Sequence, residues 1–369
     1  MQPESWYLFG LTWSQIRSHG PAFVVTRVNE NNLLIQPPMS PTTRSQLPQA
    51  RPRSLAIVCN PLSGWVRPRW DGVRESLRGL APAGFRDASA PEDLGEAALE
   101  LTEEGVRVLC VVGGDGTVQA VLTALAREVP VDRWPILSVI PAGSTNMSAK
   151  DLGMRRSPRK HLERLEAWSR GAMDEHVVRR PVVSVTGSDG VHRCGMFFGA
   201  GAVPDGVAFL RERLYQRGIP ESQTTALSVA YVLWRFARGG ERARAMTPRI
   251  ECRVDDRRVV GEATATCLIT TLDRLILGMR PHWGTEGAPL RFTLSERYTP
   301  RAWLNLPRLA TGRPGRHLTP ENGYHSHNAD QVTLRFDGAY VIDGELYRAD
   351  STSGDVEISA ITGVEWLVS

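Results

Sequence analysis

A glycine-rich segment at residues 111–117 combines residue types that suit phosphate chemistry. It reads Val-Val-Gly-Gly-Asp-Gly-Thr and stands between a β-branched apolar run at 106–112 and a stretch with apolar residues at helical spacing. Gly113, Gly114 and Gly116 can take positive φ and leave no Cβ in the way, so backbone N–H groups can approach a phosphate at the start of the helix. Asp115 offers a carboxylate for a metal ion or a hydroxyl, and Thr117 offers a hydroxyl. The alternative interpretation is a tight turn in which Thr117 caps the helix.

Two further polar loops follow predicted strands and favour the phosphate interpretation. The strands cover 55–59 and 136–140, and a helix-like segment follows at 147–152. The carboxyl ends of parallel strands line one crevice, so we expect the three loops to converge on one ligand. The candidate binding residues that the two loops add are Asn60, Pro61, Ser63, Gly64, Gly143, Ser144 and Asn146.

A pair of carboxylates near the C-terminus is a further candidate. Asp343, Gly344 and Glu345 lie between two β-like runs, 339–342 and 346–348. Taken alone, Asp-Gly in this setting is typical of a hairpin turn. A carboxylate near bound phosphates could equally orient an attacking hydroxyl.

Together these motifs resemble the diacylglycerol kinase catalytic family, which also includes sphingosine kinases and bacterial lipid kinases. The resemblance covers roughly residues 54–369. It implies ATP-dependent phosphorylation of a lipid alcohol such as diacylglycerol, with Mg²⁺ bridging the nucleotide phosphates. In this interpretation the 60–64 loop holds the nucleotide, the 113–117 loop lines its phosphates, and Ser144 and Asn146 close the cleft.

The same resemblance assigns catalytic roles to three carboxylates. The Asp-Gly-Glu of the family supplies a base for the lipid hydroxyl, and we expect Glu345 to be that base rather than Asp343. Asp343 would then orient the base or contact the metal. Asp115 would act on Mg²⁺ or on the acceptor hydroxyl.

Two departures from the family pattern limit what is carried over. The third loop reads Gly143-Ser144-Thr145-Asn146-Met147 where the family has Gly-Thr-Gly-Asn-Asp, so any role of that aspartate is in doubt. In the family segment that helps hold a structural metal, Glu286-Gly287 replaces Asp-Gly and Trp283 stands where another acid can occur. We therefore assign no residues to that structural metal site.

Two other classes of function share part of the pattern. NAD kinases and other small-molecule kinases resemble the chain in Gly-Gly-Asp-Gly, but the 60–64 loop, the third loop and the Asp-Gly-Glu favour lipid kinases. A non-catalytic nucleotide or lipid sensor would be expected to lose a catalytic carboxylate. All three candidates are retained here.

The order of strand-like and helix-like runs predicts the fold. Residues 54–177 alternate between the two, which predicts a Rossmann-like parallel α/β nucleotide domain. Residues 178–369 carry short β-like runs, which predict a mainly antiparallel β-sandwich-type lipid domain whose last strands could return to the first domain. The active site would lie in the cleft between the two. Residues 1–53 form an extension and linker of unassigned role.

Charge and cysteine content bear on partners and location. The formal net charge is +4, and almost all of the basic residues are arginine. Basic clusters at 155–160 and 235–244 suit either transient contact with anionic lipid or a solvated helix face. An apolar segment at 224–238 suits an acyl-chain pocket or the membrane interface, or else ordinary packing of a helix on the β domain. No nucleic-acid-binding motif accompanies them. Five scattered cysteines, with no convincing signal peptide, predict a cytoplasmic protein that could lie at the inner membrane face. The oligomeric state is left open, a homodimer included.

Overall fold

The computed structural model describes the backbone of residues 24–29 and 32–36, together with residues 54–209, 248–261, 264–296 and 302–368. The chain divides into two units, Met1–Pro52 and Arg53–Ser369. In the first, strands β1 (Val24–Asn29) and β2 (Asn32–Gln36) form an antiparallel hairpin. Two segments with sequence-based expectations, the apolar segment at 224–238 and the arginines at 235–244, lie outside the described residues.

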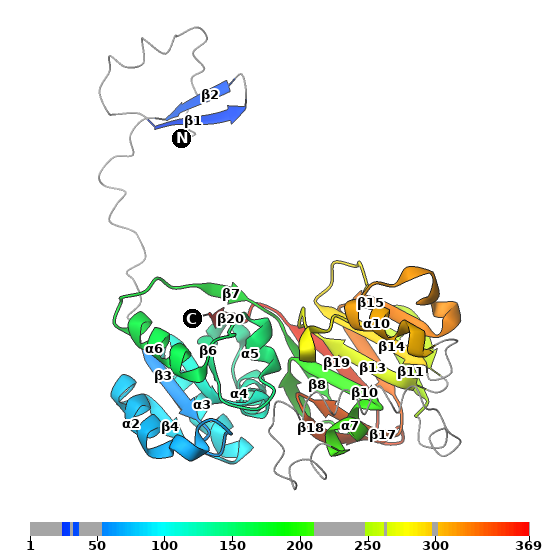
Figure 1. Ribbon diagram of the computed structural model, residues 1–369, viewed down its shortest axis with the longest axis horizontal. Helices are drawn as coiled ribbons and strands as arrows, with labels where there is room; N and C mark the ends of the chain where they lie inside the picture. Colours follow the sequence, from blue (N-terminus) through cyan, green and yellow to red (C-terminus); the bar gives the residue numbers. More distant parts are fainter. Residues whose placement is uncertain are drawn as a thin grey trace. The chain divides into compact units, whose positions relative to one another are not determined.

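The second unit begins with an α/β part built on a six-stranded sheet (Figure 1). Its strand order is β4-β3-β5-β6-β20-β7, and the pairs among β3 to β6 are parallel. The strands are β3 (Leu55–Cys59), β4 (Phe85–Asp87), β5 (Val108–Gly113), β6 (Ile136–Pro141), β7 (Val177–Arg179) and β20 (Glu365–Leu367). The C-terminal strand β20 thus pairs with β6, on the opposite side of β6 from β5.

Helices cover both faces of this sheet, as the buried, β-branched strands require. The helices are α2 (Trp70–Leu80), α3 (Pro91–Glu103), α4 (Asp115–Glu128), α5 (Met147–Asp151) and α6 (Pro158–Ser169). Alternate residues of β5 point to opposite faces. Leu109 and Val111 pack in one core with α3 and α4, while Val108 and Val112 pack in another with α2 and α6.

The rest of the second unit is a β-sandwich of two six-stranded sheets. One has the order β15-β14-β13-β10-β17-β18 and the other β12-β11-β16-β19-β8-β9, and their strand pairs are antiparallel. Side chains from both sheets form one buried core, Phe292 and Tyr340 from the first meeting Leu334 and Ile358 from the second. The predicted fold class, a parallel α/β layer followed by an antiparallel β-sandwich, is confirmed.

The bounds of the remaining elements locate the site residues that follow. The strands are β8 (Val182–Thr186), β9 (His192–Gly195), β10 (Phe197–Gly201), β11 (Ile250–Val254), β12 (Arg257–Gly261), β13 (Thr264–Thr270), β14 (Leu290–Glu296), β15 (Tyr324–Ala329), β16 (Gln331–Arg335), β17 (Gly338–Ile342), β18 (Glu345–Ala349) and β19 (Val356–Ile361). Two more helices are α7 (Val203–Phe209) and α10 (Ala302–Thr311). Among these described elements no helix is long and apolar enough to cross a membrane.

Candidate active site

Three loops at the carboxyl ends of neighbouring strands form one wall of the candidate site. They follow β3, β5 and β6, which are adjacent in the sheet. Main-chain hydrogen bonds join them: the Asn60 amide donates to Val112 over 3.0 Å, Ala142 donates to Gly113 over 2.8 Å, and Trp65 donates to Ala142 over 3.0 Å. The loops therefore meet as the sequence predicted.

The Asn60 side chain fixes the first loop to the second. Its amide group donates to Thr117 Oγ1 over 3.2 Å, and its Oδ1 accepts the Leu62 amide over 2.9 Å. Thr117 is buried in the first turn of α4. Asn60 thus positions the loop from within, because both ends of its side chain bind protein groups.

The loop glycines are required for close approach rather than for unusual backbone angles. A Cβ on Gly143 would lie 2.5 Å from the Cα of Gly114, and a Cβ on Gly113 would lie 2.4 Å from the Thr117 side chain. None of Gly113, Gly114 and Gly116 has positive φ. The expected benefit of positive φ is therefore wrong for these residues, while the expected need for a missing Cβ is met.

Asn146 shapes the third loop instead of facing the cleft. It takes a left-handed conformation, with φ of 47°, at the start of α5. Its Oδ1 accepts the Gly143 amide over 2.8 Å, and its Nδ2 donates to the Gly143 carbonyl over 2.6 Å. This pair of bonds closes the loop. Asn suits the position because it is among the few residues that tolerate the left-handed region.

Asp115 links the glycine-rich loop to α5. Its Oδ2 accepts the Met147 amide over 3.0 Å and its Oδ1 accepts the Ser148 amide over 3.2 Å. Burial raises the pKa of Asp115, and the two hydrogen bonds offset part of that rise. The carboxylate therefore caps the first turn of α5, which contains the Met147 that departs from the family pattern.

Asp343 and Gly344 form the turn of the β17–β18 hairpin, as the hairpin interpretation predicted. Both have positive φ, 47° and 95°, which is the conformation of a type I′ turn. The Asp343 carboxylate is buried and accepts the backbone amides of Met196 and Phe197, each over 2.9 Å. Burial, followed by the negative charge of Asp115, raises the pKa of Asp343 well above its usual range.

Glu345 points elsewhere although it is only two residues away. It is the first residue of β18, is half-buried, and lines the cleft. A Cβ on Gly116 would lie 3.3 Å from Glu345 Oε1, so this carboxylate reaches the first turn of α4. The hairpin turn thus separates the two carboxylates, one held by main-chain amides and one in the cleft.

The cleft itself has a volume of about 1440 Å³. Most of the predicted binding residues line it: Asn60, Ser63, Gly64, Gly114, Gly116, Thr117, Gly143, Ser144 and Glu345. The other predicted residues are not among those that line it: Pro61, Gly113, Asp115, Asn146 and Asp343. A backbone-rich wall beside the start of a helix, opposite a carboxylate, suits a phosphorylated ligand and a hydroxyl nucleophile.

Sequence reasoning missed a second group of lining residues. Gln119 and Arg127 come from α4, Arg193 from β9 and Tyr347 from β18. Gln119 lies three residues after Gly116 on a helix, and Tyr347 lies two residues after Glu345 on a strand. Both spacings place the pair on one face, which was the available signal. Nothing in the local sequence marks Arg193.

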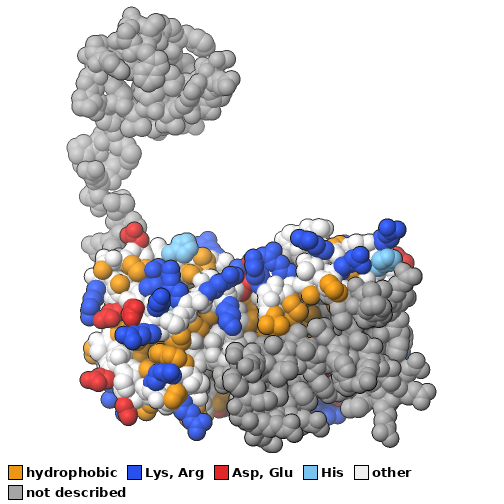
Figure 2. Space-filling model, viewed as in Figure 1, with side chains coloured by type: hydrophobic (Ala, Val, Ile, Leu, Met, Phe, Trp, Pro, Cys, Tyr) orange, Lys and Arg blue, Asp and Glu red, His pale blue; other side chains and the backbone are white. Residues whose placement is uncertain are grey.

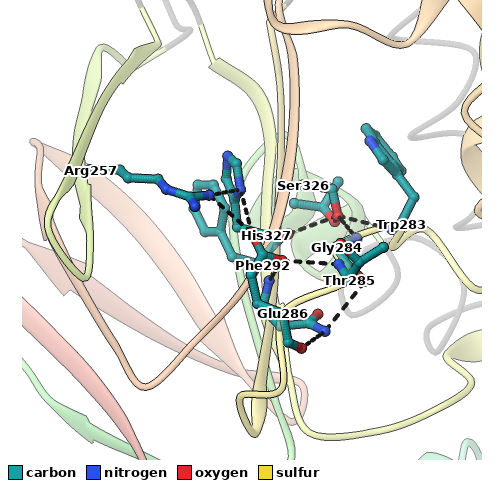
Figure 3. A network of polar contacts seen from close by, with 10 residues as sticks. Arg257, Trp283, Gly284, Thr285, Glu286, Phe292, Ser326 and His327 are labelled. Atoms are coloured by element: carbon teal, nitrogen blue, oxygen red, sulfur yellow. Dashed lines mark hydrogen bonds and ion pairs between the residues drawn. The ribbon is translucent and has the colours of Figure 1, made fainter.

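The segment at 281–290, for which no metal was assigned, is held by protein groups (Figure 3). Glu286 Oε1 accepts Arg257 over 2.9 Å and lies 3.1 Å from His327 Nδ1, while Oε2 accepts the Asn328 and Thr285 amides over 2.9 and 3.0 Å. Partial burial raises the pKa of Glu286, but these hydrogen bonds prevail and lower it to about 2. Over the described ranges no three His, Cys, Asp or Glu side chains group as a metal site.

Basic side chains on the α/β part do not form one continuous patch in the view of Figure 2, where acidic and hydrophobic side chains lie between them. The basic residues at 155–160 are exposed, and Arg159 pairs with Glu163 at 3.2 Å. These observations leave the expected contact with anionic lipid as a prediction.

Part of the chain is similar in sequence to known diacylglycerol kinases. Residues 54–175 match the family model of the diacylglycerol kinase catalytic domain. A diacylglycerol kinase of Bacillus subtilis (strain 168) is 34% identical over 104 residues, which is 27% of this chain and 33% of that protein. The match therefore spans about a third of the length of this curated relative.

Solved structures share the fold over most of the chain. A crystal structure of a diacylglycerol kinase from Bacillus anthracis str. Sterne has a TM-score of 0.55 at 15% identity, covering 87% of this chain and 98% of that one. Another crystal structure from the same organism has a TM-score of 0.58 at 17% identity, covering 86% of this chain and 97% of the other. At this identity the likeness extends to the fold alone.

Proposed function

We propose, from the match of residues 54–175 to the family model of the diacylglycerol kinase catalytic domain, that the chain is a lipid kinase that transfers the γ-phosphate of ATP to a lipid hydroxyl such as that of diacylglycerol. The observation that carries the proposal is the placement of Glu345 against Gly116, in a cleft walled by three small-residue loops. Phosphoryl transfer needs little more from a protein than alignment and charge neutralisation.

The nucleotide phosphates bind at the glycine-rich wall. Gly114 and Gly143 lack side chains and line the cleft, and the start of α4 adds the positive end of a helix dipole. Asn60 and Thr117 hold this wall in shape through their mutual hydrogen bond. Ser63 and Ser144 line the same cleft and supply hydroxyl groups.

Glu345 orients the acceptor hydroxyl and receives its proton as the new O–P bond forms and the bond between the γ-phosphorus and the β–γ bridging oxygen breaks, which releases ADP. The hydroxyl pKa lies far above neutrality and the transition state is loose, so alignment contributes more than full deprotonation. Asp343 and Asp115 act indirectly, by positioning the backbone of the site, because each carboxylate accepts hydrogen bonds from main-chain amides. Of the candidate carboxylates, Glu345 is the one that lines the cleft, and we assign it to the acceptor hydroxyl for that reason.

A divalent cation fits the donors present. Mg²⁺ is commonly held by one or two carboxylates together with substrate phosphates, and the cleft offers Glu345 beside the phosphate wall. When bound, Mg²⁺ neutralises charge on the transferring phosphoryl group. The chain's own contribution is the position of the carboxylate and of the loops.

A panel of acceptors tests the proposal. Labelled γ-phosphate of ATP, supplied with Mg²⁺, would be offered to diacylglycerol, sphingoid bases and monoacylglycerol in mixed micelles, with NAD and a sugar phosphate in parallel. Labelled lipid supports the lipid kinase and identifies its acceptor. Labelled NAD or sugar with no labelled lipid would assign the chain to another kinase class. Nucleotide binding without any transfer would make it a sensor.

The cellular location follows from the same proposal. A lipid acceptor and an ATP donor meet at the cytoplasmic face of a membrane, so we propose a cytoplasmic protein that contacts the membrane transiently. The exposed basic residues at 155–160 are candidates for that contact. Binding to anionic vesicles that falls with added salt is the expected result, and charge-reversed residues there should weaken it.

A further inference from the structure

We propose that Tyr347 is a positioning residue that sets Glu345 over the first turn of α4, and that Gln119 and Arg193 hold Tyr347 in place. The inference rests on the proposed function, since it concerns the carboxylate that meets the acceptor. It assigns a role to three of the lining residues that sequence reasoning missed. The steps that follow concern register, anchoring and the edge position of β18.

The first step is a match of spacing between a strand and a helix. Glu345 and Tyr347 are two residues apart on β18, so their side chains share one face of the strand. Gly116 and Gln119 are three residues apart on α4, so they share one face of the helix. Glu345 Oε1 meets the Gly116 position, and Gln119 Nε2 donates to the Tyr347 hydroxyl over 3.0 Å. The contact of Glu345 with Gly116 and that of Tyr347 with Gln119 therefore lie side by side, along one turn of α4.

The second step is that Tyr347 is held on its ring as well as at its hydroxyl. The Arg193 guanidinium carbon lies 4.5 Å from the centre of the Tyr347 ring, a cation–π contact. Arg193 is itself fixed by two hydrogen bonds to Asp189, of 3.1 and 2.8 Å, and one of 3.1 Å to the Val191 carbonyl. The aromatic ring therefore has a defined orientation before any ligand binds.

The third step is that β18 needs such an anchor. It is the last strand of its sheet and pairs only with β17 on one side. Its other edge has no strand partner in the described sheet, so contacts with α4 help fix its position. Gln119 is 4% exposed, so leaving its side-chain amide without a hydrogen bond would destabilise the folded chain, and the bond to Tyr347 is strongly favoured. The α4 contact therefore locates β18, and with it Glu345.

Kinetic variants separate positioning from general stability. Tyr347→Phe removes the hydroxyl and keeps the ring, and Gln119→Leu removes the donor. Each should lower kcat for lipid phosphorylation about tenfold while KM for ATP stays within about twofold. The double variant should fall no further than either single variant. Tyr324→Phe is the matched control, because it removes a buried tyrosine hydroxyl within 3.4 Å of Asn305, outside the cleft.

A second background makes the test specific for Glu345. In Glu345→Gln, adding Tyr347→Phe should change the residual kcat by less than twofold, because there is no carboxylate left to position. A further tenfold loss in that background would overturn the inference, as would full activity of Tyr347→Phe in the otherwise unchanged chain. Failure of the proposed function looks different: the unaltered chain would then phosphorylate no lipid, and both proposals would be lost together.

Discussion

The carboxylate of Glu345 lies against Gly116, so closely that a methyl group on the glycine would come to 3.3 Å from Oε1. One residue belongs to an edge strand of the β-sandwich and the other to the first turn of the helix that follows the glycine-rich loop. Their contact joins the phosphate wall of the cleft to its carboxylate. The predictions below follow from this contact and from the groups that maintain it.

Gly116→Ala tests the contact directly. The added methyl group displaces Glu345 by a few tenths of an ångström, and we expect kcat to fall about tenfold because catalytic alignment is sensitive to such shifts. Stability should change by less than about 1 kcal/mol, since alanine is favoured in a helix. Gly79→Ala in α2, where an added Cβ meets nothing within 4 Å, is the control and should leave kcat unchanged. Equal kinetics for the two variants would contradict the assignment.

Replacing Glu345 should lower activity and leave stability almost unchanged, whereas replacing Asp343 should lower stability. Glu345→Gln should lower kcat by roughly a hundredfold or more, in the range of a lost general base, with little change in stability. Asp343→Ala leaves the Met196 and Phe197 amides unpaired, so we expect a loss of roughly 2–4 kcal/mol in the free energy of unfolding. Chemical denaturation and steady-state kinetics on both variants measure the two effects. A stable but inactive Asp343→Ala would reverse the roles.

Asp115→Ala should destabilise the third loop. The variant removes the acceptor for the Met147 and Ser148 amides, and we expect a loss of roughly 1–3 kcal/mol from the cap of α5. Hydrogen exchange at these two amides should rise relative to the unaltered chain. Ser76→Ala, on the exposed face of α2, is a control that leaves α5 untouched. Unchanged exchange at Met147 and Ser148 would show that the carboxylate does not cap the helix.

Glu286 should make stability depend on pH in the acid range. Its pKa is lowered in the folded chain, from the ordinary value of 4.5 to about 2, so its contribution is present above pH 4.5 and is lost as the pH falls towards 2. Glu286→Gln should therefore cost about 1 kcal/mol at pH 7, a modest figure because the group is partly exposed. The difference from the unaltered chain should shrink as the pH falls below 4.5 and vanish only below about pH 2. A difference that stays constant between pH 7 and 2 would exclude this linkage.

Local sequence patterns predicted the fold well where the physics is local. The strand expected at 55–59 has the observed bounds, because buried apolar runs flanked by turn residues are distinctive. The strand expected at 106–112 begins two residues later, at Val108, and ends at Gly113, since side-chain type alone does not fix where a sheet ladder begins.

The site was predicted less evenly, for a physical reason. Sequence motifs indicate which loops converge, because parallel strands end at one edge, but they do not show which way a side chain points. Asp343 and Glu345 are two residues apart, on either side of a tight turn. The carboxylate of Asp343 is buried and accepts main-chain amides, whereas that of Glu345 faces the cleft. Arg193 reaches the cleft because β9 packs against α4, a long-range contact that no local pattern encodes.

The central claim is that Glu345 acts on a lipid hydroxyl beside a bound nucleotide. The most direct measurement is transfer of labelled γ-phosphate from ATP to diacylglycerol in mixed micelles, for the unaltered chain and for Glu345→Gln, with ATP affinity determined by calorimetry on both. The account predicts labelled lipid from the unaltered chain, a loss of at least about a hundredfold in Glu345→Gln, and ATP affinities within a few-fold of each other. Equal transfer by the two proteins, or no labelled lipid from the unaltered chain, would contradict it.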